Sequence, residues 1–222
     1  MHIATTRNHK ARKLSFSIAL VIALGFIGYS LYSFWLQYSA THQLPKEVQP
    51  DSIITYSTDI PDETPPLCRE DNFPASQPRY INIPTIGAGG CIQKVGIDQH
   101  SAMAVPSNIH LSGWYVKSVA PGQTGLSVID GHSGGKYLDG IFKHLAELKL
   151  DDKFTIEFGD KSKKTFQVVS VNHYSVDETS KRMLEKNSDI KKQLNLITCG
   201  TNYSSDIQGY KDRVLVVAKS VE

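Results

Sequence analysis

Short apolar segments separated by turn residues recur along the chain from residue 79 onward. They are rich in β-branched side chains, and most are bounded by Gly, Pro, Asn or Asp, which is typical of β-strands. The pattern predicts strands over 80–83, 91–97, 126–129, 154–158, 165–171, 194–198 and 213–218. Their spacing favours a mostly-β fold, a closed or nearly closed barrel, over an array of strands alternating with helices.

Two helices are predicted between these strands. Over 137–148, apolar side chains recur at steps of three and four and form one stripe, made of Leu138, Ile141, Phe142, Leu145 and Leu148. A weaker pattern over 178–186 predicts a second, shorter helix.

The N-terminal part of the chain contains one long apolar segment, residues 14–36, without a charged side chain. At 1.5 Å per residue it spans about 34 Å, enough to cross a hydrocarbon core of about 30 Å. Four basic residues and no acidic residue precede it, so we expect residues 1–13 in the cytoplasm and the rest of the chain outside. A cleavable signal peptide is the alternative, but its apolar region would run only about 7–15 residues. We therefore expect a single-pass anchor in the cell membrane.

Residues 37–78 are rich in Pro, Ser, Thr, Asp and Glu and keep no helical or strand period. A flexible extracellular stalk is the simplest interpretation. The alternative is that part of the segment, around 71–73, folds over an active site as a lid. The expected organisation is thus a cytoplasmic tail, an anchor, a stalk, and a catalytic domain over 79–222.

Charge argues against nucleic-acid binding. The chain carries a formal net charge of +2, but four of its 24 basic residues lie before the anchor. The remainder has 20 basic against 22 acidic side chains, and such a surface offers no attraction for a polyanion.

The three cysteines are an odd number, so at least one is unpaired within the chain. Cys199 is the candidate for the free thiol. Cys68 and Cys91 form either a disulfide, which an oxidising exterior permits, or two buried small side chains. Without a Cys-x-x-Cys or His-x-x-His spacing, we expect no metal site.

A thiol active site is suggested by three residues at the ends of predicted strands. Cys199 closes an apolar run, His132 lies 67 residues before it in a glycine-rich turn, and Arg213 lies 14 residues after it. If the strands around the 200–212 loop pair antiparallel, Cys199 neighbours Arg213, whose positive charge favours a thiolate. Each residue alone has an ordinary structural explanation; only their combination points to catalysis. The order His before Cys argues against a papain-like enzyme.

These residues lie in motifs that resemble those of the sortases, membrane-anchored cysteine transpeptidases of the Gram-positive type of envelope. The histidine segment, the family's TLxTC element and the arginine match in order as Ile129-Asp130-Gly131-His132, Leu196-Ile197-Thr198-Cys199 and Arg213. Supporting matches are Ile81-Asn82-Ile83-Pro84, Gly113-Trp114-Tyr115 with Pro121-Gly122, and Gly140-Ile141-Phe142 through Leu145. The glycine–tryptophan–tyrosine pattern is most similar to the class F-like branch. Asn195 departs from the family, which has the first Thr of TLxTC there.

The resemblance implies a closed barrel of about eight strands with one or two short helices. It also implies cleavage of an LPxTG-like sorting motif between Thr and Gly, through a thioester on Cys199, without a cofactor. The acyl group then passes to an amine, on a peptidoglycan precursor or a pilin lysine. His132 would act as acid and base, Arg213 would stabilise the oxyanion or hold the substrate backbone, and Thr198 would assist substrate binding.

Two other functions remain open from the sequence. One is a catalytically inactive, membrane-anchored binding module built on the same barrel. The other is a hydrolytic cysteine protease or an L,D-transpeptidase, although the latter would place its histidine close before the cysteine.

Overall fold

The computed structural model describes residues 25–33, 63–66, 68, 73–98, 102–206 and 209–221. The chain divides into two compact units, residues 1–49 and 50–222. In the first, residues 25–33 form a helix. Over the described ranges, no helix combines the length and the apolar character needed to span a bilayer. The remainder of the predicted anchor, 14–24 and 34–36, lies outside the described residues.

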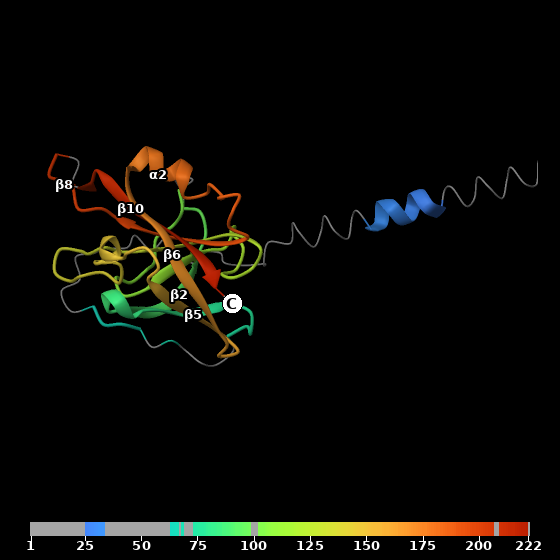
Figure 1. Cartoon of the computed structure of the whole chain (residues 1–222), viewed down its shortest axis with the longest axis horizontal. Helices are drawn as coiled ribbons and strands as arrows, with labels where there is room; N and C mark the ends of the chain where they lie inside the picture. Colours follow the sequence, from blue (N-terminus) through green and yellow to red (C-terminus); the bar gives the residue numbers. More distant parts are fainter. Residues whose placement is uncertain are drawn as a thin grey trace, which may run out of the picture. The chain divides into compact units, whose positions relative to one another are not determined.

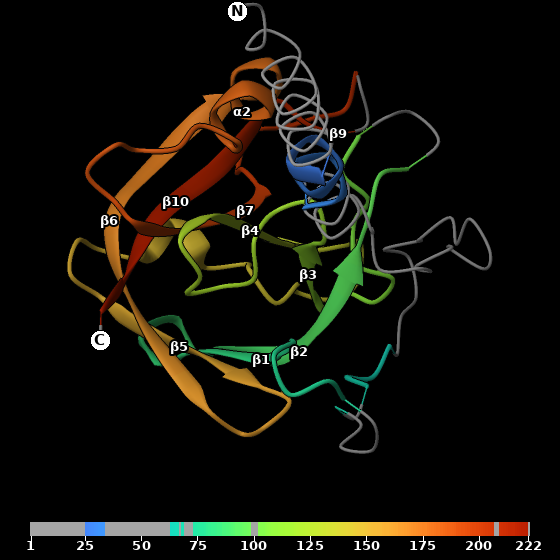
Figure 2. The same cartoon turned by 90° about the vertical axis from the view of Figure 1, so that its right-hand side faces the viewer.

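The second unit is built on a closed barrel of eight strands (Figure 2). Around the barrel the order is β1-β2-β3-β4-β7-β10-β6-β5, with β5 paired to β1. The strands are β1 (Pro78–Ile83), β2 (Ala88–Val95), β3 (Ser112–Tyr115), β4 (Gly125–Gly131), β5 (Lys153–Phe158), β6 (Lys163–Ser175), β7 (Lys192–Cys199) and β10 (Asp212–Val221). The β2–β3 and β4–β7 pairs are parallel, and the other pairs are antiparallel.

Few other elements accompany the barrel. Helix α2 (Val176–Arg182) follows β6 and lies at one end of it (Figure 1). Strands β8 (Tyr203–Ser204) and β9 (Gly209–Tyr210) form a two-stranded sheet between β7 and β10. Two 3-10 turns, η1 (Pro84–Ile86) and η2 (Leu145–Glu147), complete the described elements.

Alternation along the strands separates an inner face from an outer face. On β7, Leu194 and Leu196 belong to the main core, together with Val214 and Val216 of β10. The residues between them on each strand therefore point away from that core, because successive side chains of a strand alternate between faces. Cys199, the predicted nucleophile, is on this outer face.

The predicted mostly-β barrel is confirmed, and each predicted strand overlaps an observed one. The pattern missed β3, which is four residues long and begins Ser112-Gly113. It also began β2 too late, because the strand starts in Ala88-Gly89-Gly90, where small residues carry no strand signal. The short helix is confirmed as α2; it starts at Val176 because Ser175 and Glu178 form a capping box.

The α-helix predicted over 137–148 is wrong, because the segment contains only the short 3-10 helix η2. Its apolar stripe is buried as expected, with Phe142 and Leu145 in the main core. However, two backbone N–H groups at its centre bond outside the segment, that of Phe142 to the carbonyl of His132 and that of Ile141 to the carbonyl of Ile109. Others, such as that of Leu145, bond three residues back, as in a 3-10 turn. Gly140 allows this approach, because a Cβ there would collide with the His132 carbonyl. Contacts with the turn after β4 thus override the helical periodicity.

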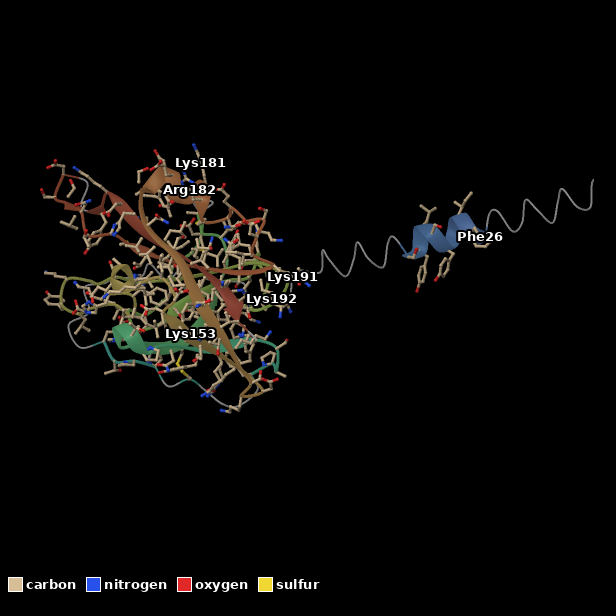
Figure 3. All side chains as sticks on the ribbon, in the orientation of Figure 1. Phe26, Lys153, Lys181, Arg182, Lys191 and Lys192 are labelled. Carbon is tan, nitrogen blue, oxygen red and sulfur yellow. A yellow bond between two sulfur atoms is a disulfide. The ribbon has the colours of Figure 1, made fainter. Side chains whose placement is uncertain are left out.

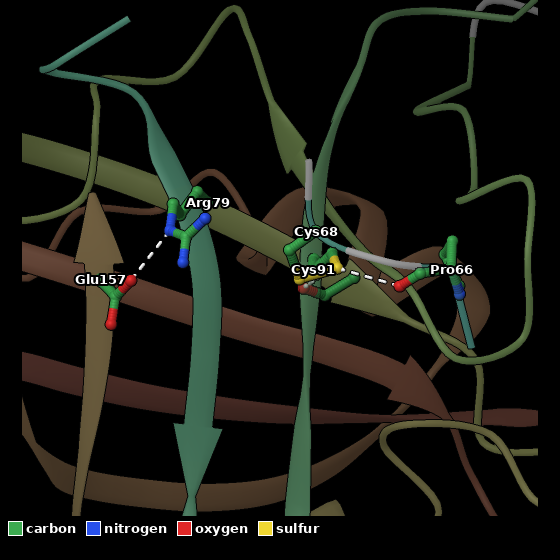
Figure 4. Close-up of a disulfide and its surroundings, with 6 residues drawn as sticks. Pro66, Cys68, Arg79, Cys91 and Glu157 are labelled. Atoms are coloured by element: carbon green, nitrogen blue, oxygen red, sulfur yellow. Dashed lines mark hydrogen bonds and ion pairs between the residues drawn. A yellow bond between two sulfur atoms is a disulfide. The ribbon is translucent and has the colours of Figure 1, made fainter. Parts of the chain in front are cut away.

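Part of the predicted stalk is bound to the barrel. Cys68 forms a disulfide with Cys91 of β2, so the disulfide alternative is the correct one (Figure 4). Upstream of it, Glu63 accepts a hydrogen bond from the backbone N–H of Ile109 at 3.0 Å. The Asn108 amide donates to the carbonyl of Thr64 at 3.2 Å. The described residues of this segment, 63–66 and 68, are therefore tied both covalently and by hydrogen bonds to the domain. The lid hypothesis centred on 71–73, of which 71 and 72 lie outside the described residues.

Candidate active site

Cys199 and Arg213 are direct cross-strand partners where β7 ends and β10 begins. Paired residues project to the same face, so both half-buried side chains lie on the outer face of the barrel. One guanidinium nitrogen of Arg213, Nη1, donates to the carbonyls of Tyr210 and Asp212, at 3.1 and 3.0 Å. These bonds leave the guanidinium's other N–H groups for a further acceptor. The predicted adjacency of the cysteine and the arginine is confirmed.

Thr198 joins the end of β7 to the end of β4. Its hydroxyl donates to the carbonyl of Gly131 at 2.7 Å in a buried setting. His132 is the next residue after Gly131, so this bond fixes where the histidine turn leaves the barrel. The side chain of Thr198 is on the face opposite to that of Cys199. Its observed contact is therefore structural, and its predicted part in substrate binding stays a prediction.

The imidazole ring of His132 is held at its Nε2 atom, which lies 3.0 Å from the carbonyl oxygen of Pro106. Burial lowers the pKa of the imidazole; the bond to Pro106 and the negative charge of Glu63 oppose that shift. Because Glu63 belongs to the segment tied down by the disulfide, the N-terminal segment takes part in tuning the histidine.

The thiol of Cys199 is the free one, since the other two cysteines are bridged. Burial raises its pKa, and this outweighs the opposite effects of the Arg213 charge and of the nearby Ser133 hydroxyl. The charges of Asp130 and Asp212 raise the pKa of the thiol further. We expected Arg213 to favour a thiolate; it does so, but in this environment the neutral thiol predominates at neutral pH.

Asp212 organises the turn that follows the cysteine. Its backbone carbonyl accepts the N–H of Gly200 at 2.8 Å, and its carboxylate accepts the N–H of Asn202 at 2.9 Å. The second carboxylate oxygen lies 3.0 Å from Nδ1 of His173 on β6. Burial opposes ionisation, but the bonds from His173 and from the backbone prevail and lower the pKa of the carboxyl. A charged Asp212 therefore clamps the chain between Cys199 and β8.

Next to the cysteine–arginine pair lies a second pair, Ile197 and Leu215, on the same face. They form a small apolar cluster, separate from the main core, with partly buried side chains of neighbouring segments. We call it the outer apolar cluster; its members are Val128, Ile197 and Leu215, covered by Met103, Tyr115, Leu126, Tyr174 and Met183.

Comparison with known proteins identifies the family. A profile described as the sortase domain matches residues 81–221, more than half of the chain. The chain belongs to the sortase family. Sortases are cysteine transpeptidases. The matched region contains the free cysteine, its arginine partner and the whole barrel except the first three residues of β1. A comparison with curated proteins gave no match.

A solved structure of sortase A shares this fold, and other sortases are also similar to it. A lid mutant of sortase A from Corynebacterium diphtheriae is 27% identical, with a TM-score of 0.52 over 68% of this chain and 72% of that one. The sortase D5 transpeptidase of Clostridium perfringens is 21% identical, with a TM-score of 0.49 over 68% and 84% of the two chains. A sortase C of Clostridium perfringens, solved with the C-terminal cell wall sorting motif, is 22% identical, with a TM-score of 0.48 over 68% and 74%. The class F-like assignment stays a prediction.

Three residues near the candidate site of this sortase were missed from the sequence. Ser133 and Asp212 directly follow or precede predicted site residues, but a serine or an aspartate in a turn is too common to be singled out. Glu63 carries no local signal, because only the folded segment brings it near His132. Glu63 affects the pKa of His132, and Ser133 and Asp212 affect the pKa of Cys199.

Proposed function

We propose that this sortase is a membrane-anchored transpeptidase that cleaves an LPxTG-like sorting motif and transfers the acyl group to an amine. The acceptor would be a peptidoglycan precursor or a pilin lysine. The proposal is carried by the direct pairing of Cys199 with Arg213 on the outer face of a sortase barrel. A thiol beside a fixed positive charge suits the formation and breakdown of a thioester.

In the first step, the Cys199 thiolate attacks the carbonyl carbon of the motif's threonine. The negative charge that develops on the carbonyl oxygen is stabilised by the unengaged N–H groups of Arg213. Protonated His132 gives its proton to the departing glycine amine as the C–N bond breaks. In the second step, neutral His132 takes a proton from the incoming amine, which attacks the thioester and releases the thiolate.

The two pKa shifts define the reacting form of the enzyme. Burial favours the neutral thiol of Cys199 and the neutral imidazole of His132. The reactive thiolate with a protonated imidazole is then a minority of the molecules at neutral pH, and its population limits the rate. Arg213, Ser133 and Glu63 each shift the equilibrium toward that form.

The sorting peptide would lie along the outer apolar cluster. Ile197 and Leu215 adjoin the cysteine–arginine pair on the same face, so a peptide whose threonine carbonyl reaches Cys199 would meet the partly buried side chains that cover them. Apolar side chains of the motif that precede the threonine would be buried there. We place the reaction outside the cell membrane because residues 14–36 and the basic residues before them predict an anchor with a cytoplasmic N-terminus.

A ligation assay tests the proposal. The full chain in detergent is mixed with an LPxTG-containing peptide and an amine acceptor, with Cys199→Ala as the control. A joined product that the control does not form supports a transpeptidase. Cleavage without joining would favour a hydrolytic protease, and an inert wild type across a library of motifs would favour a binding module.

A further inference from the structure

Two amide side chains are buried on the outer face of β7. Gln193 is 2% exposed and Asn195 is 0% exposed. By strand alternation both share the face of Ile197 and Cys199, and Asn195 lies about 13 Å along the strand from the cysteine. Burying an amide is costly unless its polar atoms find partners, so the partners indicate what the two residues do.

Those partners are backbone groups of the segment 183–187, which follows α2. The Asn195 amide donates to the carbonyl of Met183 at 2.9 Å. The Gln193 amide donates to the carbonyl of Glu185 at 3.1 Å and to Oδ1 of Asn195 at 2.9 Å. The Gln193 carbonyl oxygen accepts the N–H of Asn187 at 2.7 Å. Two linked side chains thus bind the segment at three alternate residues.

Apart from these bonds, the segment is held by short-range backbone bonds, from the Glu185 N–H to the Arg182 carbonyl and from the Ile190 N–H to the Asn187 carbonyl. Side chains of residues 184–189 are exposed, and the carbonyl of Met183 is among those that a helix end leaves without an intrahelical partner. Met183 itself is the exception, since its side chain packs on the outer apolar cluster. Arg182 is at the end of α2 (Figure 3). Its guanidinium lies over the Tyr174 ring of the same cluster at 4.7 Å.

We propose that Gln193 and Asn195 are specificity-determining positioning residues, which fix Met183 where the sorting peptide's first apolar side chain would pack. This inference rests on the proposed function. In an LPxTG-like motif, the leucine precedes the threonine by three residues, about 10 Å in an extended peptide. That distance from Cys199 falls between Ile197 and Asn195, at the cluster that Met183 covers.

Asn195 is the position at which this chain departs from the TLxTC pattern. A threonine there has one hydroxyl on a shorter side chain, in place of a planar amide with separate donor and acceptor ends. A single hydroxyl oxygen on this shorter side chain does not span the distance between the Met183 carbonyl and the Gln193 amide, whereas the two ends of the Asn195 amide reach both. Asn195 therefore fixes the position of Met183 beside the substrate without contacting the reacting Cys199.

Hydrogen exchange tests the positioning part without a substrate. In the full chain, Gln193→Met removes the acceptor of the Asn187 N–H and should speed exchange of that amide about fivefold or more. Asn195→Thr should speed exchange over 183–187 through the loss of Gln193's partner. Gln167→Met is the matched control, since Gln167 on β6 makes an exposed bond to Asp151. Unchanged exchange at Asn187 in Gln193→Met would overturn the proposal.

Peptide kinetics test the specificity part. Motif peptides that differ only in the first residue, Leu against Ala, are compared for kcat and KM. Asn195→Thr should reduce the preference for Leu about threefold to tenfold, mainly through KM, because the apolar contact between Met183 and the leucine side chain is weakened. The rate of Cys199 alkylation by iodoacetamide should stay at the wild-type value, which a general loss of structure would not allow.

The outcomes are distinguishable. Faster exchange with an unchanged preference for Leu would overturn the specificity role. A wild type that turns over neither peptide would overturn the proposed function and the specificity role with it, while the exchange data would still decide the positioning role.

Discussion

Arg213 directly faces Cys199 across the β7–β10 pair, and its guanidinium is fixed by two backbone carbonyls. The charge opposes the effect of burial on the thiol without overcoming it. The arginine therefore has two separable effects, one on the free thiol and one on the oxyanion that forms during the reaction. The first can be measured without a substrate.

Replacing Arg213 by Met should raise the pKa of the Cys199 thiol, because the opposing positive charge is lost. It should also lower kcat/KM about a hundredfold or more through the oxyanion. The pH dependence of alkylation by iodoacetamide measures the first effect. Arg79→Met is the control, because it removes an arginine that is paired with Glu157 across the β1–β5 strand pair, away from the site. A thiol titration that is the same in Arg213→Met and wild type would contradict the assigned interaction.

Glu63→Gln should lower the pKa of His132 below its already lowered value, because a negative charge that favours the imidazolium is removed. The acidic limb of the pH–rate profile should move to lower pH, and the rate at neutral pH should fall. A titration of the His132 ring by NMR measures the shift. Glu147→Gln, which removes an exposed carboxylate bonded to His144, should leave the titration of His132 unchanged.

Asp212→Asn should act on the cysteine in two opposite ways. Removing the negative charge should lower the pKa of the Cys199 thiol, so alkylation should reach its plateau at lower pH. Turnover should nevertheless fall, because the carboxylate's bonds to the Asn202 N–H and to His173 are weakened. Asp160→Asn, in an exposed turn with Ser162, provides the comparison. A variant with faster turnover than wild type would show that the clamp does not matter for catalysis.

The Cys68–Cys91 disulfide closes a loop with a sequence separation of 23 residues and holds the segment that carries Glu63. Its reduction should lower the free energy of unfolding by roughly 2–4 kcal/mol. It should also lower the pKa of His132, because Glu63 is released. Thermal unfolding with and without reductant, in a Cys199→Ala background that excludes other thiol chemistry, measures the first effect. Identical unfolding curves would contradict the stabilising role.

The sequence was sufficient for the barrel and for the cysteine–arginine pair, because both depend on strand periodicity. Cys199 closes one apolar run and Arg213 opens another, and a single antiparallel pairing of those runs sets them opposite each other. The failures involve contacts that periodicity does not encode. The stripe at Phe142 and Leu145 is buried without a helix, because the backbone near Gly140 bonds to the turn after β4.

The residues that surround the site, and their effect on its pKa values, could not be predicted from local sequence patterns either. Glu63 reaches the histidine only through a fold in which the disulfide and the bonds to Asn108 and Ile109 hold its segment down. The balance of burial and charge that raises the pKa of Cys199 depends on the depth of the thiol, which no sequence motif specifies. Asn195 was read as a departure from a motif; its buried bonds give it a structural purpose.

The central claim is that Cys199 forms a thioester with a sorting peptide. Mass spectrometry of the intact full chain, quenched in acid during turnover of an LPxTG-containing peptide, tests it directly. The account predicts an adduct equal to the fragment ending in threonine less one water, which maps to Cys199, disappears on adding hydroxylamine and is absent from Cys199→Ala. Turnover of the peptide with no such adduct in wild type, or the same adduct in Cys199→Ala, would contradict it.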